Sequence, residues 1–369
     1  MNSTLRWYFI ALLFTCWSQL AAAQDAQVAV PINAVDGILT AFKTHSIVAL
    51  DEGNHGNEQG AAFRLSLIRD PRFPLVVNDI VVEFGNSLYQ GVIDRFVDGQ
   101  AVPEKELQQV WQNTTQRQEW DKPIYEQFFR AVRDLNLRLP KTHRLRVILG
   151  DPPIDWGRIK SETDLRKIDR PDSFPVGVIQ REVLDKGRKA LVIYGGLHYL
   201  RKNLYWQHPD RQRAERDFNA PVDSIVTLLE GNHPGSIFSI YTNTNADLTK
   251  VGANAASWQA PQLVILRGTE FGAASFTMFY TAFATKFNPD GSTEQFGLDP
   301  VRSPKMQDEY DALLYLGPPS SITYSKISPK LCSDPEYLKM RQQRFAFLGA
   351  QAERFGAALR ASCAEVSAK

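Results

Sequence analysis

Three apolar runs with the pattern of buried β-strands each end in glycine together with an ionisable side chain. The motifs are Glu52-Gly-Asn-His55 after the run 46–51, Glu83-Phe-Gly after the run 79–82, and Gly-Gly-Leu-His198 after the run 190–194. In open α/β sheets, ligands bind outside the carboxyl ends of the strands. The pattern therefore predicts that these side chains converge at one edge of a sheet, although each motif alone is also typical of an ordinary turn.

Strand and helix patterns alternate along the first half of the chain. Strands are predicted at 47–50, 75–84, 144–149 and 190–194, and helices at 58–69, 88–97 and 173–186. Residues 103–138 have the pattern of a helical insertion. This alternation predicts an α/β fold with a mostly parallel central sheet and helices on both faces.

The C-terminal half is more irregular. Strands are predicted at 224–230, 236–241, 263–266 and 311–316. Residues 268–297, rich in Gly, Thr, Phe and Asn, are expected to form a lid or a substrate-facing loop. No composition shift marks a boundary, so residues 24–369 are expected to form one domain.

Residues 1–23 have the features of a cleaved secretory signal. Arg6 provides a positive start, residues 7–17 are apolar, and Leu20-Ala-Ala-Ala23 is a small-residue cleavage site. The apolar run is short for a membrane span, although an uncleaved anchor remains an alternative. No later segment reaches transmembrane length, so the mature protein is expected to be periplasmic or secreted and to have no membrane span.

The charge balance argues against a polyanionic partner. The chain has 42 Lys and Arg against 41 Asp and Glu, and loss of Arg6 with the signal makes the two equal. A balanced chain lacks the basic surface that nucleic acid or anionic lipid requires. The expected partner is a small-molecule or peptide substrate.

Two cysteines follow the signal, Cys332 and Cys363. An oxidising compartment favours a disulfide between them. Residues 334–360 have a helical pattern, however, and an unbroken helix would hold the two cysteines far apart. A bridge requires a break near Gly349 or Gly356, and the sequence leaves both outcomes open.

Glu52 and His55 lie three residues apart on a glycine-containing turn. A carboxylate beside an imidazole fixes its tautomer and raises its basicity, which suits a general base. The same pair could provide ligands to a metal. Glu58, three residues further on, either supports this site or stabilises the start of the next helix.

Glu83 lies in an otherwise apolar strand, where a carboxylate is costly to bury without a partner. Metal ligation or proton transfer would explain it, and a salt bridge to Arg64 or Arg95 is the structural alternative. His198 follows two glycines that leave room for a ligand at the strand end. His55, Glu83 and His198 are therefore the candidate metal ligands.

Asp151 ends a further strand and could join the same site, although the prolines after it also suit a turn. His233 is a reserve candidate. The sequence contains no His-Glu-x-x-His, Gly-x-Ser-x-Gly, Walker or Gly-x-Gly-x-x-Gly motif. The sequence therefore lacks the motifs typical of serine hydrolases and of nucleotide-dependent enzymes.

The order of the Glu52, His55, Glu83 and His198 motifs resembles the superfamily of erythromycin esterases, ChaN-type haem-uptake proteins, TraB and Tiki proteins. The likeness spans roughly residues 45 to 200, and residues 311–318 resemble a late strand of some members. One departure is that this chain has Asp-Glu-Gly-Asn-His where many members have Gly-Glu-x-x-His.

The resemblance implies several chemistries. Erythromycin esterase-like members open a lactone with water, Tiki-like members are metal-dependent peptidases, and ChaN-like members bind haem. It implies here a hydrolase in which His55, Glu52, Glu83 and His198 are catalytic and Glu58, Asp151 and Arg64 support them. A divalent metal is a possible cofactor, and a haem- or iron-binding protein without turnover is the alternative function.

Overall fold

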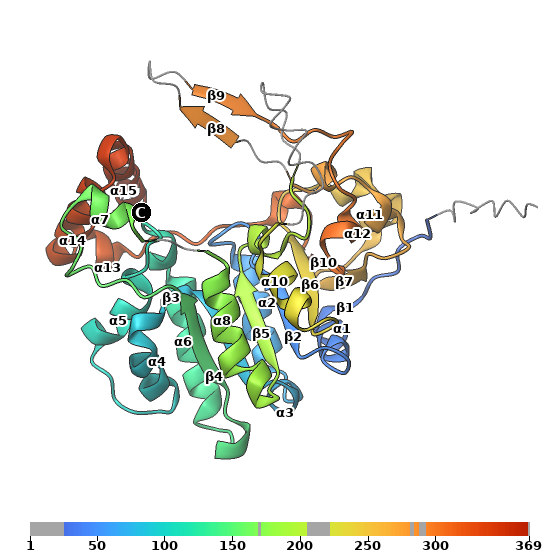
Figure 1. Ribbon diagram of the computed structural model, residues 1–369, viewed down its shortest axis with the longest axis horizontal. Helices are drawn as coiled ribbons and strands as arrows, with labels where there is room; N and C mark the ends of the chain where they lie inside the picture. The colour runs from blue at the N-terminus through green and yellow to red at the C-terminus, as the bar shows by residue number, and fades with distance from the viewer. Residues whose placement is uncertain (1–25, 169–170, 205–221, 281–283, 288–292, 368–369) are drawn as a thin grey trace, which may run out of the picture.

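The computed structural model describes residues 26–168, 171–204, 222–280, 284–287 and 293–367 (Figure 1). The predicted signal, residues 1–23, lies outside these ranges. The protein has an α/β fold with a mixed, mostly parallel sheet and helices on both faces, which confirms the predicted fold class.

The central sheet has eight strands in the order β1-β7-β10-β6-β2-β5-β3-β4. Their bounds are β1 (Ile32–Asn33), β7 (Gln262–Ile265), β10 (Ala312–Tyr315), β6 (Ile237–Asn243), β2 (Ile47–Asp51), β5 (Ala190–Tyr194), β3 (Asp79–Asn86) and β4 (Arg146–Asp151). The strands from β10 to β4 are parallel, whereas β7 runs antiparallel to β10 and β1. A separate antiparallel hairpin joins β8 (Ala284–Phe287) and β9 (Thr293–Phe296).

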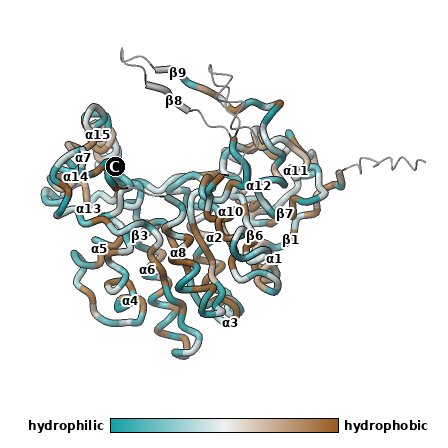
Figure 2. The backbone as a smooth tube through the Cα atoms, viewed as in Figure 1, coloured by the Kyte–Doolittle hydropathy of each residue, from teal (hydrophilic) through white to brown (hydrophobic). Residues whose placement is uncertain are grey.

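Alternate residues of β2 enter two different cores, because successive strand side chains point to opposite faces. Val48 and Leu50 pack with the helices of the first face, and Ile47 and Ala49 with those of the second. The brown, hydrophobic segments of the tube accordingly concentrate in the sheet (Figure 2). A sheet buried on both faces explains the continuous apolar runs of the sequence.

The helices of the first face are α1 (Ala34–Ala41), α2 (Glu58–Arg69), α3 (Phe73–Val76), α4 (Gln90–Val97), α5 (Glu104–Gln112) and α6 (Pro123–Asn136). Those of the second face are α8 (Ser173–Glu182), α10 (Ile225–Asn232), α11 (Glu270–Ala273) and α12 (Met306–Glu309). The short helix α7 (Glu162–Arg166) lies beside the C-terminal helices α13 (Pro329–Cys332), α14 (Pro335–Ala346) and α15 (Ala352–Ser367) (Figure 1). No helix in the described ranges is both long and apolar enough to cross a membrane.

Two sequence-based assignments were wrong. The segment 224–230, predicted as a strand, is the helix α10, whose first turn is closed by reciprocal hydrogen bonds between Ser224 and Thr227. This capping box outweighs the β-branched run that suggested a strand. The strand predicted to begin at residue 75 begins at Asp79, because α3 occupies the preceding residues.

Cys332 and Cys363 form a disulfide with 5.3 Å between their Cα atoms. The predicted helix 334–360 is broken between α14 and α15, where Gly349 has a φ of 57°. This left-handed conformation favours glycine, and it turns α15 back toward α13. The break that the sequence required for a disulfide is therefore present near one of its two expected positions.

Replacing both cysteines with serine is expected to lower the free energy of unfolding by about 4 kcal/mol, because the bridge closes a long loop in the unfolded chain. The cysteines are 31 residues apart. Urea denaturation of the double variant and the oxidised parent would measure the difference. Equal midpoints in the two proteins would contradict the expectation.

Candidate functional site

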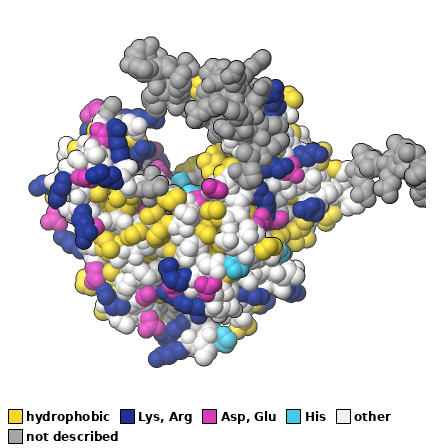
Figure 3. Space-filling model, viewed as in Figure 1, with side chains coloured by type: hydrophobic (Ala, Val, Ile, Leu, Met, Phe, Trp, Pro, Cys, Tyr) yellow, Lys and Arg dark blue, Asp and Glu magenta, His cyan; other side chains and the backbone are white. Residues whose placement is uncertain are grey.

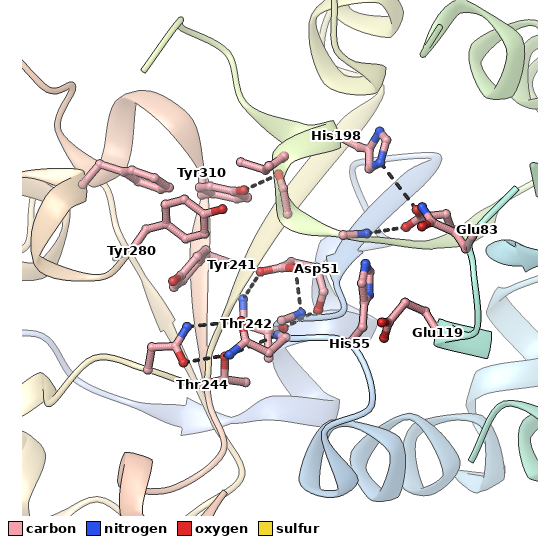
Figure 4. A pocket seen from close by; sticks show the side chains of 18 residues that line it. Asp51, His55, Glu83, Glu119, His198, Tyr241, Thr242, Thr244, Tyr280 and Tyr310 are labelled. Carbon is pink, nitrogen blue, oxygen red and sulfur yellow. Dashed lines mark hydrogen bonds and ion pairs between the residues drawn. The ribbon is translucent and has the colours of Figure 1, made fainter. Parts of the chain in front are cut away.

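A cavity of about 460 Å³ opens at the carboxyl ends of the central parallel strands (Figure 4). It is lined by Asp51, Gly53, Asn54, His55, Glu83, Gln116, Glu119, Gly195, Gly196, Leu197, His198, Tyr241, Thr242, Thr244, Asn245, Phe276, Tyr280 and Tyr310. The space-filling view shows a hollowed surface here, with a histidine at its floor (Figure 3). The structure thus brings His55, Glu83 and His198 to one cavity.

Glu52 is fully buried beneath the first turn and connects His55 with Arg64. Its Oε2 lies 3.0 Å from His55 Nδ1, and its Oε1 accepts a hydrogen bond of 3.3 Å from Arg64 Nη2. The Asn57 amide donates to the Glu52 carbonyl oxygen at 2.7 Å and holds the turn that precedes α2. A carboxylate at Nδ1 favours the tautomer protonated there, which leaves Nε2 of neutral His55 as the acceptor.

Glu83 and His198 form the second part of the site. Glu83 Oε2 accepts a hydrogen bond of 2.9 Å from the Gly195 N–H, and Glu83 Oε1 lies 3.6 Å from His198 Nε2. On its other side, His198 Nδ1 lies 2.6 Å from Asp172 Oδ1, at the start of α8. A carboxylate therefore lies close to each ring nitrogen of His198.

His55 and Glu83 both pack closely against Gly195. A Cβ atom at Gly195 would lie 3.6 Å from both His55 Nε2 and Glu83 Oε2, and 3.3 Å from His55 Cε1. Both side chains also line the same cavity, which gives water access to an imidazole nitrogen and a carboxylate oxygen. Trp120 packs edge-on against the His55 ring, with 4.7 Å between the ring centroids, and restricts its orientation.

Neighbouring carboxylates raise the pKa of both histidines. Burial lowers the pKa of His55, but the hydrogen bond with Glu52 and the charges of Glu52 and Glu83 raise it overall to about 9. Burial also lowers the pKa of His198, and its contacts with Asp172 and Glu83 raise it overall to about 10. Both side chains are therefore imidazolium at neutral pH.

The two glutamates remain ionised despite their burial. Burial raises the pKa of Glu52, but the hydrogen bond with His55 and the charge of Arg64 hold it below its usual value. Burial likewise raises the pKa of Glu83, which the two nearby histidines and the Gly195 N–H lower overall. Each imidazolium group of the site therefore lies next to at least one ionised carboxylate.

Two of the expected supporting residues lie outside the cavity wall. Glu58 is exposed in the first turn of α2, where its Oε2 accepts a hydrogen bond of 2.6 Å from Thr323 Oγ1. Arg64 is buried and pairs with Glu52 rather than with Glu83. Arg64 therefore contacts Glu52 and does not reach the cavity wall. Glu58 lies in the first turn of α2, as expected of a residue that stabilises the start of that helix.

Asp151 lines a second cavity that shares Glu83 and His198 with the first. It therefore lies beside the candidate site, on the far side of those two residues. His233 follows α10 and bonds to Gln180 Oε1, away from the cavity. The structure does not bring this reserve candidate to the site.

Sequence reasoning missed several residues that line or support the cavity. Asp51 ends β2 with its carboxylate in the cavity wall, and the signal that identified Glu83 could have identified it. Asp172 had no such signal, because it follows a proline and precedes a helix. Tyr241, Tyr280 and Tyr310 come from segments far apart in the sequence, and their convergence is a property of the tertiary structure.

The side chains as placed do not form a metal centre. Within the described ranges, no group of three or more His, Cys, Asp or Glu side chains could hold a metal ion. The carboxylates at Nδ1 of His55 and His198 do not themselves argue against ligation, because metal-binding histidines commonly have such a partner.

Neither a family model nor a curated protein matches the sequence. Among solved structures, a succinoglycan biosynthesis protein is 10% identical with a TM-score of 0.50, and the match covers 78% of this chain and 93% of that one. A Bacillus cereus protein is 11% identical with a TM-score of 0.48, covering 82% and 97% of the two chains. The erythromycin esterase EreC is 10% identical with a TM-score of 0.47, covering 79% and 94%. The match to the succinoglycan biosynthesis protein shows a shared fold, and at 10% identity it shows the fold alone.

Proposed function

We propose that this protein is an exported hydrolase in which His55 activates water against an ester, lactone or amide bond. The observation that carries the proposal is that His55 and Glu83 line one cavity beside Gly195, where a Cβ atom would lie 3.6 Å from both His55 Nε2 and Glu83 Oε2. These are a proton acceptor and an orienting carboxylate, the two groups that general-base hydrolysis needs.

The reaction follows from these positions. Neutral His55 takes a proton at Nε2 while the water oxygen forms a bond to the carbonyl carbon, and the carbonyl oxygen becomes an oxyanion. The His198 imidazolium stabilises that negative charge. The oxyanion then re-forms the carbonyl as the bond to the leaving group breaks, and His55 returns its proton to the leaving oxygen or nitrogen. One water is consumed, and an acid and an alcohol or amine are released.

Export is supported by two independent features. The first 23 residues have the sequence of a secretory signal. The Cys332–Cys363 disulfide is of a kind that persists in oxidising compartments such as the periplasm or the extracellular space. The proposed location is therefore periplasmic or secreted.

The hydrolysis rate is expected to rise with pH until about 9 and to fall above about 10, following the two histidines. The rate is expected to rise as His55 loses its proton and becomes a base. It is expected to fall as His198 loses the positive charge that stabilises the oxyanion. Initial rates with p-nitrophenyl butyrate across this range would measure both limbs. A rate that changes only in proportion to hydroxide concentration, as in the absence of enzyme, would overturn the proposed function.

The matched variant for this measurement is Glu52→Gln. Glu52 makes the largest contribution that raises the pKa of His55, so its neutral amide is expected to move the rising limb to lower pH. The falling limb, which belongs to His198, is expected to stay in place. A rising limb that does not move would show that His55 is not the titrating base.

A further inference from the structure

We propose that the cavity wall opposite His55 binds a substituted ammonium group of the substrate, between the carboxylate of Asp51 and the rings of Tyr241, Tyr280 and Tyr310. The inference rests on the proposed function, because it places the scissile bond at His55 and the cation on the other side of Asp51. It narrows the substrate class to esters or amides that carry a tertiary or quaternary amine.

Asp51 is a buried carboxylate that forms no ion pair with any described residue. Its side chain is 3% exposed yet forms part of the cavity wall. It accepts hydrogen bonds from the Gly53 N–H at 2.7 Å and the Thr242 N–H at 3.0 Å, and no ion pair involves it among the described residues. Burial raises the pKa of Asp51 to about 7, although the Thr242 and Gly53 N–H groups lower it, so a ligand cation would stabilise the ionised carboxylate.

Aromatic rings form the wall next to this carboxylate. The ring centroids of Tyr241 and Tyr310 are 5.4 Å apart, and those of Phe276 and Tyr280 are 5.5 Å apart. Figure 4 shows Tyr241, Tyr280 and Tyr310 on one side of Asp51, and His55 and Glu83 on the other. A ligand that reaches both sides would extend across Asp51.

The charge of Asp51 is felt by all three tyrosines. Burial raises the pKa of each phenol, and the Asp51 carboxylate raises it further. The hydroxyls of Tyr241 and Tyr310 already donate to backbone carbonyls, those of Phe279 at 2.8 Å and Gly196 at 2.6 Å. With those hydroxyls engaged, the rings contribute mainly their aromatic surfaces to the wall.

The remaining charges of the cavity favour a cation over an anion in this half. Among the described residues that line the cavity are three carboxylates, Asp51, Glu83 and Glu119, and neither a Lys nor an Arg. The two histidines lie on the reacting side, where each already faces a carboxylate. An ammonium ion is attracted both by a carboxylate and by the negative faces of aromatic rings.

Choline and its uncharged analogue 3,3-dimethylbutan-1-ol test the cation site without any hydrolysis. Isothermal titration calorimetry is expected to show that choline binds about tenfold more tightly than the analogue, because the two differ mainly in charge. In Asp51→Asn this preference is expected to disappear. Equal affinities in the parent protein, or a preference retained in Asp51→Asn, would overturn the proposal.

Two further variants control for structure and for general charge loss. Glu119→Gln removes another carboxylate of the cavity, which is paired with Lys122 at 2.7 Å, and is expected to keep most of the preference. Tyr280→Leu, at a half-buried ring, is expected to weaken choline binding with Asp51 intact. If Asp51→Asn does not fold, Tyr280→Leu provides the test of the cation site. An unchanged preference for choline over the uncharged analogue in Tyr280→Leu would contradict the proposed contact with the aromatic ring.

The ester pair butyrylcholine and 3,3-dimethylbutyl butyrate separates this inference from the proposed function. A kcat/KM about tenfold higher for butyrylcholine supports both. Choline binding without hydrolysis of either ester would retain the cation site and refute the hydrolase. Equal hydrolysis of both esters, with no choline preference in calorimetry, would retain the hydrolase and refute the cation site.

Discussion

Replacing His55 with alanine is expected to lower kcat/KM for an ester substrate by about 1000-fold, the usual loss when a general base is removed. His55 Nε2 is the ring nitrogen on the side of Gly195 and the cavity, and Glu52 holds the other ring nitrogen. The side chain is 30% exposed, so its loss leaves little empty volume in the core. The thermal unfolding midpoint is therefore expected to change much less than the rate.

A second substitution separates loss of the base from loss of the partner of Glu52. His55→Gln preserves a polar side chain near Glu52 but cannot accept the proton, and it is expected to be as inactive as His55→Ala. His233→Ala, which removes a histidine outside the cavity, is the matched control and should retain the parental rate. Substantial activity in His55→Gln would show that another group activates the water.

Replacing Arg341 with methionine is expected to destabilise the protein by about 3–5 kcal/mol, because it leaves a buried carboxylate without its counter-ion. Arg341 and Asp121 form an ion pair whose side chains are 2% and 0% exposed. Asp121 also accepts a hydrogen bond from the Tyr337 hydroxyl. Urea unfolding followed by circular dichroism would measure the free-energy difference.

The double variant Asp121→Asn, Arg341→Met tests the cause of this loss. Removing the stranded charge is expected to recover part of the stability that Arg341→Met loses. Arg360→Met is the matched control, because the Arg360–Glu353 pair lies at the surface and surface pairs contribute little. If the double variant were no more stable than Arg341→Met, the uncompensated charge would not be the origin of the loss.

The central sheet was predictable because its signal is local. β2, β3 and β5 each contain a continuous apolar run, which is typical of strands buried on both faces. Parallel strands end at one edge of a sheet, so the convergence of His55, Glu83 and His198 followed from their strand-end positions. The helix α10 could not be distinguished in this way, since its short apolar run fits either periodicity and a capping interaction decides.

The other half of the cavity depends on contacts between distant segments. Tyr241 is in β6, Tyr280 follows α11, and Tyr310 precedes β10. None of these tyrosines has a neighbouring motif that distinguishes it from a core aromatic residue. The pairing of Asp172 with His198 depends on how α8 packs against the sheet. Such positions are set by tertiary packing, which the order of residues along one segment does not encode.

Whether the Cys332–Cys363 disulfide forms depends on the compartment in which the protein is produced, and this affects any assay. The disulfide joins α13 to α15, and the helix between them, α14, carries Arg341, which pairs with Asp121. Asp121 directly follows Trp120, the residue packed against His55. Protein prepared in a reducing cytosol would have two thiols in place of this covalent tie. Specific activities are therefore comparable only between preparations with matched thiol content, and a weak preparation should be re-oxidised before the site is judged inactive.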